Sequence, residues 1–171
     1  MQHTIIAKME NKPGVLNRIA SLFRRRNYNI ESLNVGHTEN PHISRMTVVM
    51  DGTEEAAQIL EANLYKLVNI IDVEQVTHLP VVARDLALIK VEAAPNRRSE
   101  IASLADIFRA KIVDVAADSV IVEITGTEEK IEGLVELLLP MGIIEMVRTG
   151  QVAMLRGKVS ENVSRPLISD D

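Results

Sequence analysis

The sequence contains no cysteine and no tryptophan, and aromatic residues make up only 2% of it. The lack of cysteine excludes disulfides and thiolate chemistry and fits a reducing compartment. No apolar segment approaches the ~18 residues that a membrane-spanning helix needs. The first residues also lack the basic start and long apolar run of a secretory signal peptide. We therefore expect a cytoplasmic protein that does not associate with membranes.

An excess of basic residues is also missing, because the formal net charge is −5. Nucleic-acid binders usually carry a basic surface, so we expect no nucleic-acid partner. Hydrophobic residues make up 46% of the 171 residues, which is enough for an aliphatic core of Ile, Val, Leu and Met. A chain of this length forms one large domain or two small ones.

An internal repeat favours two domains. The tetrapeptide IASL occurs at Ile19–Leu22 and again at Ile101–Leu104, and DGTEE at Asp51–Glu55 is echoed by TGTEE at Thr125–Glu129. These matches occur in the same order at equivalent places in the chain, which indicates two copies of one unit.

Each copy shows the order strand, helix, strand, strand, helix, strand, judged from apolar periodicity. In the first copy the strands are expected at 3–10, 29–38, 44–51 and 70–77, with helices over 13–26 and from Thr53, which can cap the second helix. In the second copy the strands are expected at 84–93, 111–116, 119–126 and 142–149, with helices over 96–109 and from Thr127. We therefore predict an α+β fold of two ferredoxin-like βαββαβ domains, whose antiparallel sheets are covered by helices on one face.

The predicted division places the first domain at 1–78, a linker marked by Pro80 at 79–84, and the second domain at 85–157. Residues 158–171 show no apolar period, and we expect them to form a mobile tail.

The first strand ends in a turn, MENKPGVLNR, that contains Asn11, Pro13 and Gly14. Free N–H groups at a helix start attract carboxylates, and glycine allows a ligand to approach the backbone. The segment NIESLNV should be an edge strand, which we expect to pair with the same strand of a second copy about a two-fold axis. That pairing would bring Asn29 of one protomer beside the turn of the other.

Amide side chains both donate and accept hydrogen bonds, so the arrangement suits a small apolar amino acid. The candidate effector-binding residues are Asn11, Gly14, Val15, Leu16, Asn29 and Ile30. The second copy has Ala93, Asn96 and Lys111 in place of Asn11, Gly14 and Asn29, so the fold does not require those residues. An ordinary turn remains the alternative, because Asn, Pro and Gly are common turn residues.

Other clusters carry less weight. His37 and His42 flank a loop with Glu39, but two histidines without a firm third ligand are weak support for a metal site. The basic run Arg24–Arg26 suits the C-terminal end of a helix, and a partner contact is the alternative. We find no catalytic triad and no phosphate-binding loop, so we expect no catalytic residue, cofactor site or metal site on this chain.

The segments NKPGVLNRIASLFRRRNYNIESLNVG, SRMTVVM, QILEANLYKLVNIIDV and RDLALIKV resemble the ACT domain and, over residues 2–157, the small regulatory subunit of acetolactate synthase. The resemblance implies that the homodimer expected from the edge strand is a non-catalytic subunit. This subunit binds and activates a catalytic subunit and confers feedback inhibition by valine or a related amino acid in branched-chain amino-acid biosynthesis. It implies that thiamine diphosphate, Mg²⁺ and FAD belong to that catalytic subunit. The alternatives are a stand-alone amino-acid-sensing ACT protein, an RNA-binding module of the same topology and a stand-alone enzyme.

Overall fold

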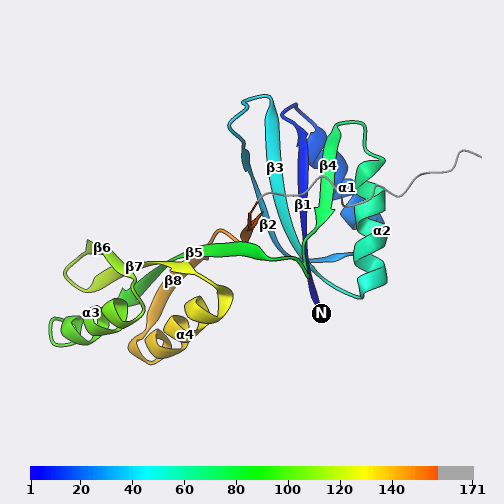
Figure 1. The fold of residues 1–171 in the computed structure, drawn as a ribbon. Coiled ribbons are helices and arrows are strands. Elements are labelled where there is room, and N and C mark those ends of the chain that lie inside the picture. Colours follow the sequence, from blue (N-terminus) through cyan, green and yellow to red (C-terminus); the bar gives the residue numbers. More distant parts are fainter. Residues whose placement is uncertain (158–171) are drawn as a thin grey trace, which may run out of the picture.

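Two antiparallel sheets, one from each copy of the repeat, organise the chain (Figure 1). The computed structural model describes residues 1–157. The elements of the first copy are β1 (Gln2–Glu10), α1 (Val15–Arg26), β2 (Asn29–His37), β3 (Ile43–Asp51), α2 (Glu54–Tyr65) and β4 (Ile70–Gln75). Those of the second are β5 (Val81–Glu92), α3 (Arg98–Ile107), β6 (Lys111–Val115), β7 (Ser119–Gly126), α4 (Glu128–Leu138), a short 3₁₀ helix (Leu139–Met141), β8 (Ile143–Arg148) and β9 (Val152–Leu155). The predicted fold class is confirmed.

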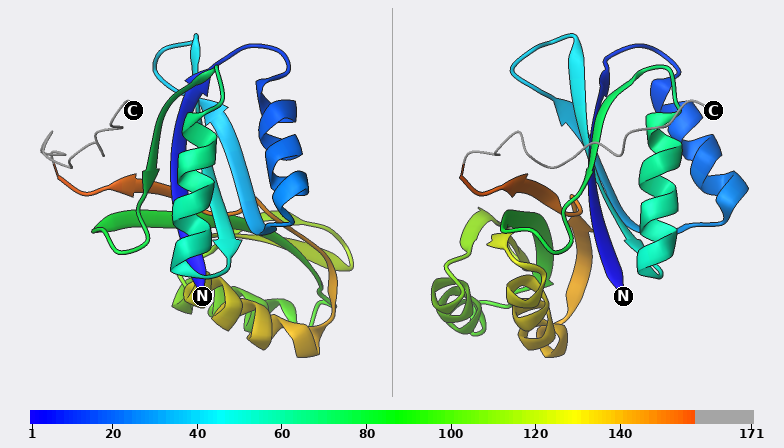
Figure 2. Two further views of the ribbon diagram at one scale, coloured as in Figure 1. Left: turned by 90° about the vertical axis from the view of Figure 1, so that its right-hand side faces the viewer. Right: turned by 45° about the vertical axis from the view of Figure 1, so that its right-hand side comes forward.

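Helices α1 and α2 cover one face of the first sheet, and α3 and α4 cover one face of the second (Figure 2). Ile19, Leu22 and Phe23 recur at helical spacing on α1, and all three are buried. They share one core cluster with Ile5 of β1 and Met46 of β3. An aliphatic core therefore fixes each helix on its sheet without help from aromatic stacking, apart from the edge-to-face pair of Phe23 and Tyr28.

The second sheet has its own core, built in the same way. Ile89 and Val91 of β5 are fully buried in one cluster with Ile101 of α3 and with Leu134 and Leu138 of α4. Each copy therefore holds a separate layer of apolar side chains between its helices and its sheet.

The second strand of each copy lies at a sheet edge. The strand orders are β2-β3-β1-β4 and β6-β7-β5-β8, as the repeat predicts. Strand β2 carries an irregularity between Ile30 and Ser32, where Glu31 is left over in the pairing with β3. Such a bulge reverses the facing of the side chains that follow it. Ile30 therefore packs against the helix-side core, whereas Ser32 faces the uncovered side of the sheet.

The predicted linker at 79–84 needs correction. Strand β5 already begins at Val81, and residues 81–84 pair with β9, a strand that periodicity did not reveal. Pro80 lies immediately before the strand, so it marks the start of β5 and not a free connection. The β5–β9 ribbon packs on the uncovered face of the first sheet, where Ile6, Val76 and Ala153 form a small buried cluster.

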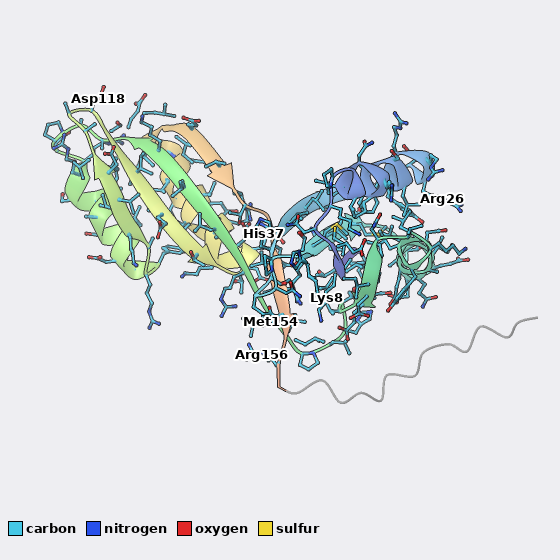
Figure 3. All side chains as sticks on the ribbon, turned by 90° about the horizontal axis from the view of Figure 1, so that it is seen from above. Lys8, Arg26, His37, Asp118, Met154 and Arg156 are labelled. Carbon is cyan, nitrogen blue, oxygen red and sulfur yellow. The ribbon has the colours of Figure 1, made fainter. Side chains whose placement is uncertain are left out.

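The two domains form separate lobes that meet at this ribbon (Figure 3). Arg26 lies at the far end of one lobe and Asp118 at the far tip of the other, whereas Met154 lies near the junction. The tail predicted at 158–171 lies outside the described residues.

Candidate functional site

The turn between β1 and α1 leaves the start of α1 uncovered. Gly14 is the N-cap residue, with φ 83° and ψ −9°, in the left-handed region that favours glycine. No side chain caps this helix, and apart from Gly14 and its two chain neighbours no residue comes within 4 Å of the position that a Cβ of Gly14 would occupy. A ligand can therefore approach the backbone at this point without displacing a side chain.

Helix α1 differs from the other three α-helices in the described residues, because its first turn contains no acidic residue. Within the part of the chain that the structure describes, no hydrogen bond uses the backbone N–H groups of Leu16 and Asn17. Unpaired N–H groups and the helix dipole both favour an anion at such an end. The start of α1 therefore suits a carboxylate.

Asn11 is tied to the β2–β3 hairpin by its backbone and its side chain. Its backbone N–H donates to the carbonyl oxygen of His42 at 2.8 Å, and its Nδ2 donates to the carbonyl oxygen of Pro41 at 2.9 Å. Nδ2 also lies 3.3 Å from Nδ1 of His37. With its nitrogen engaged in this way, the amide presents its oxygen as a hydrogen-bond acceptor.

Glu10, the residue before the turn, is occupied by its own neighbours. Hydrogen bonds from the Asn69 amide and from the Lys12 ammonium group, 3.0 Å away, hold the pKa of the Glu10 carboxyl below its usual value. The carboxylate is therefore ionised at neutral pH and paired within the protomer.

Val15 and Leu16 lie side by side in the chain but face different surroundings. The Val15 side chain is buried in the core of the first domain, so only its backbone is close to the turn surface. Leu16 is 46% exposed. Of the two, Leu16 is the residue whose side chain can meet a ligand.

Asn29 and Ile30 lie at the opposite end of the sheet from Asn11. Asn29 pairs with Asp51, which also pairs with Gln2 at the start of β1, whereas Asn11 follows the last residue of β1. The nine residues of β2 span roughly 26 Å at about 3.3 Å per residue. A single protomer therefore does not bring the six candidate residues together.

Sequence reasoning missed the contribution of the hairpin tip, where Pro41 and His42 hold Asn11. The signal was available in the lengths of β2 and β3, because two nine-residue antiparallel strands must place their turn beside the end of β1.

Within residues 1–157, no group of three or more His, Cys, Asp or Glu side chains is placed to hold a metal ion.

Two cavities lie away from this turn. One, of about 440 Å³, lies between the two domains and is lined by Ser32, Asp85 and Arg148 among others. Another, of about 300 Å³, lies between the uncovered face of the first sheet and β9, next to Lys8 and Arg45.

None of the helices in the described part of the chain has the length and apolarity that crossing a bilayer requires.

Comparisons with known proteins cover both domains. Residues 5–72 match the family described as the AHAS small subunit-like ACT domain. Residues 84–157 match the family described as the small subunit of acetolactate synthase. The chain belongs to the family of acetolactate synthase small subunits.

Individual relatives agree with this membership over nearly the full length. A probable acetolactate synthase small subunit of Archaeoglobus fulgidus is 50% identical over 157 residues, which are 92% of this chain and 98% of the relative. The acetolactate synthase small subunit of Bacillus subtilis is 44% identical over 171 residues, 99% of each chain.

A solved structure of an acetolactate synthase small subunit has the same fold. The crystal structure of the Thermotoga maritima protein superposes with a TM-score of 0.86 at 40% identity, covering 93% of this chain and 99% of that one. The resemblance stated from the sequence is therefore confirmed, and the turn and β2 both fall within the matched ACT domain.

Proposed function

We propose that this chain is the regulatory subunit of an acetolactate synthase. It binds the catalytic subunit, raises its activity, and makes that activity sensitive to feedback by valine or a related branched-chain amino acid. Thiamine diphosphate, Mg²⁺ and FAD belong to the catalytic subunit in this proposal. The observation that carries it is the open, glycine-capped start of α1 in a member of this family.

The effector site is completed by a second copy of the chain. Strand β2 is an edge strand, and Leu33 and Val35 on its helix side are 38% and 39% exposed. Pairing β2 with its counterpart about a two-fold axis would cover these side chains. The antiparallel pairing would also carry Asn29 of the partner subunit across to the turn at Asn11 and Gly14, which one protomer cannot do.

A small apolar amino acid then has a place for each of its groups. Its carboxylate accepts hydrogen bonds from the N–H groups of Leu16 and Asn17, and its ammonium group donates to the Asn11 amide oxygen. Asn29 of the partner subunit adds a second amide, and its neighbour Ile30 joins Leu16 in contacting the aliphatic side chain. Val15 contributes through its backbone. Asn11 enters the site already oriented by the hairpin.

The first test is copurification of the chain with a candidate catalytic subunit, followed by assay with and without valine, leucine and isoleucine. Calorimetry with the same amino acids measures binding to the small subunit alone. We expect a stable complex, higher activity than the catalytic subunit alone, and inhibition by at least one of the three. Binding of an amino acid without any complex would instead favour a stand-alone sensor.

A pair of substitutions at Gly14 tests the site itself. Gly14→Asp places a negative charge beside the ligand carboxylate, and like charges in contact oppose binding by several kcal/mol, so affinity should fall at least about a hundredfold. Gly14→Asn is the matched control, because Asn has the same shape without the charge and tolerates the left-handed conformation. Normal binding by Gly14→Asp would show that the site lies elsewhere.

A further inference from the structure

The segment Thr149–Gln151, between β8 and β9, joins the second domain to strand β2 of the first. The Gln151 N–H donates to Ser32 Oγ at 3.4 Å, and the Asn34 amide nitrogen donates to the Thr149 carbonyl oxygen at 3.5 Å. Thr4 of β1 adds a hydrogen bond to the Gln151 side chain at 3.2 Å. These contacts link the domains at the edge strand that the proposed effector site uses.

The same segment is fixed to the second domain by buried charge. Thr149 Oγ1 donates to Asp85 Oδ1 at 3.1 Å, and the guanidinium of Arg148 pairs with the same carboxylate at 2.8 Å. Asp85 is only 7% exposed. The residues just before Gly150 are therefore anchored to Asp85 within β5.

Gly150 touches Ser32 so closely that only glycine fits. Its φ is +79°, and a Cβ at this position would lie 2.9 Å from the Ser32 Cβ. Two non-bonded carbon atoms do not come this close, so one of the two residues would have to move. We define the pair Ser32 and Gly150 as the interdomain joint.

The joint lies close to Asn29 of the same chain, which contacts the ligand held by the turn of the partner subunit in the proposed site. Ser32 follows the bulge at Glu31, and the Asn29 amide donates to the Glu31 carboxylate across this bulge at 2.5 Å. A ligand that engages Asn29 competes with Glu31 for the amide. Because a bulged residue is left out of the ladder, Glu31 can change position without breaking the pairing of β2 with β3.

Space beside the joint allows such a movement. The cavity of about 440 Å³ between the domains is lined by Glu31, Ser32 and Gly150, and also by Asp85 and Arg148. The other interdomain contact is closed at its centre, because Ile6, Val76 and Ala153 are buried against one another at the β5–β9 ribbon. The cavity of about 300 Å³ next to Lys8 lies beside this cluster. Arg45 fastens that ribbon further by donating to the Ala153 carbonyl oxygen at 2.6 Å.

We propose that the Ser32–Gly150 joint transmits occupancy of the effector site to the second domain, with the β5–β9 ribbon as the fixed pivot. This inference rests on the proposed function, and it assigns the route by which that site regulates the holoenzyme. Amino-acid binding and activation of the catalytic subunit need not pass through the joint, whereas inhibition must.

The test is Gly150→Ala in the reconstituted holoenzyme. The added Cβ separates the two halves of the joint, so we expect the amino-acid concentration for half-inhibition to rise at least tenfold. Binding to the small subunit, measured by calorimetry, and activation without amino acid should both stay within threefold of wild type. The matched control is Gly157→Ala, because Gly157 has a similar φ of +70° with nothing within 4 Å of its Cβ position. This control should be inhibited normally.

A second variant separates the contact from backbone strain and from poor folding. Adding Ser32→Gly to Gly150→Ala removes the atom that the new Cβ meets, and inhibition should return at least partly. Normal inhibition of Gly150→Ala would overturn the proposal, as would loss of binding in that variant or failure of the rescue. Absence of binding and inhibition in the wild-type protein would contradict the proposed function itself, which is a different result.

Discussion

The two copies of the repeat differ at single residues in ways that can be measured. Thr53 and Thr127 stand in equivalent GTEE segments, and both are N-cap residues with extended backbone. Thr53 Oγ1 accepts a hydrogen bond from the Ala56 N–H at 3.2 Å, whereas Thr127 makes no side-chain cap bond. The threonine side chain therefore caps α2 with a hydrogen bond, whereas at the start of α4 it makes no such bond.

Thr53→Ala should lower the free energy of unfolding by about 1 kcal/mol, because the helix loses a capping acceptor. Thr127→Ala should lower it by less than about 0.5 kcal/mol, since no such bond is lost. Urea denaturation followed by circular dichroism suits a chain without tryptophan. Equal losses in the two variants would show that the caps do not differ in solution.

At the scale of elements, the exposed edge of β2 is the feature with the most consequences. Edge strands present unpaired backbone groups to other chains, and proteins block this pairing with charged residues such as lysine. Strand β2 has no lysine, and its only carboxylate, that of Glu31, lies at the bulge. Strand β2 therefore lacks these blocks to pairing, which is what the proposed dimer requires.

Val35→Lys should prevent dimer formation, because a charge would have to be covered at the seam between two β2 strands. Val35 is 39% exposed, and Ile59 on α2 provides a control at 42%. Sedimentation should show a monomer for Val35→Lys and a dimer for Ile59→Lys, and only the first should lose amino-acid binding. A dimeric Val35→Lys protein that binds normally would rule out this seam.

Sequence periodicity predicted most elements well, because many have one buried face and the order of the first six recurs in the second copy. The alternation in β7 and the helical spacing in α1 gave bounds close to those observed. Strand β9 escaped because four residues, Val152–Leu155, are too few for a period and acquire meaning only beside β5. The same shortage of local signal made residues 81–84 look like a linker.

Residues of the candidate site could be identified from the sequence where neighbouring residues in the chain mark them. Their surroundings could not be predicted where these depend on tertiary contacts. Gly14 was marked by its place before an amphipathic helix. The hydrogen bonds from Asn11 to Pro41 and His42 join residues about thirty positions apart. No local pattern around Asn11 shows this contact, and only the lengths of β2 and β3 indicate that their turn lies beside it. The burial of Val15 was likewise decided by which face of α1 meets the sheet.

For the whole molecule, the turn and Asn29 lie at opposite ends of one sheet, so the proposed function requires each effector site to be shared between two protomers. Gly14→Asp and Asn29→Ala should each abolish binding in homodimers. A dimer mixed from the two variants keeps one site with an unaltered turn and an unaltered Asn29. Calorimetry on the two proteins unfolded and refolded together should therefore recover binding, whereas the separately refolded variants should show none. No recovery would place both halves of the site in one chain.

The ribbon of β5 and β9 makes the two halves of the chain depend on each other. Ile6 and Val76 belong to one half and Ala153 to the other, and all three are buried in one cluster that both halves build. If the chain were divided near Pro80, both pieces would retain a complete helix-covered core, yet each would expose an apolar patch to water. Each half therefore keeps water away from an apolar surface of the other, so neither half is a self-sufficient piece of the molecule.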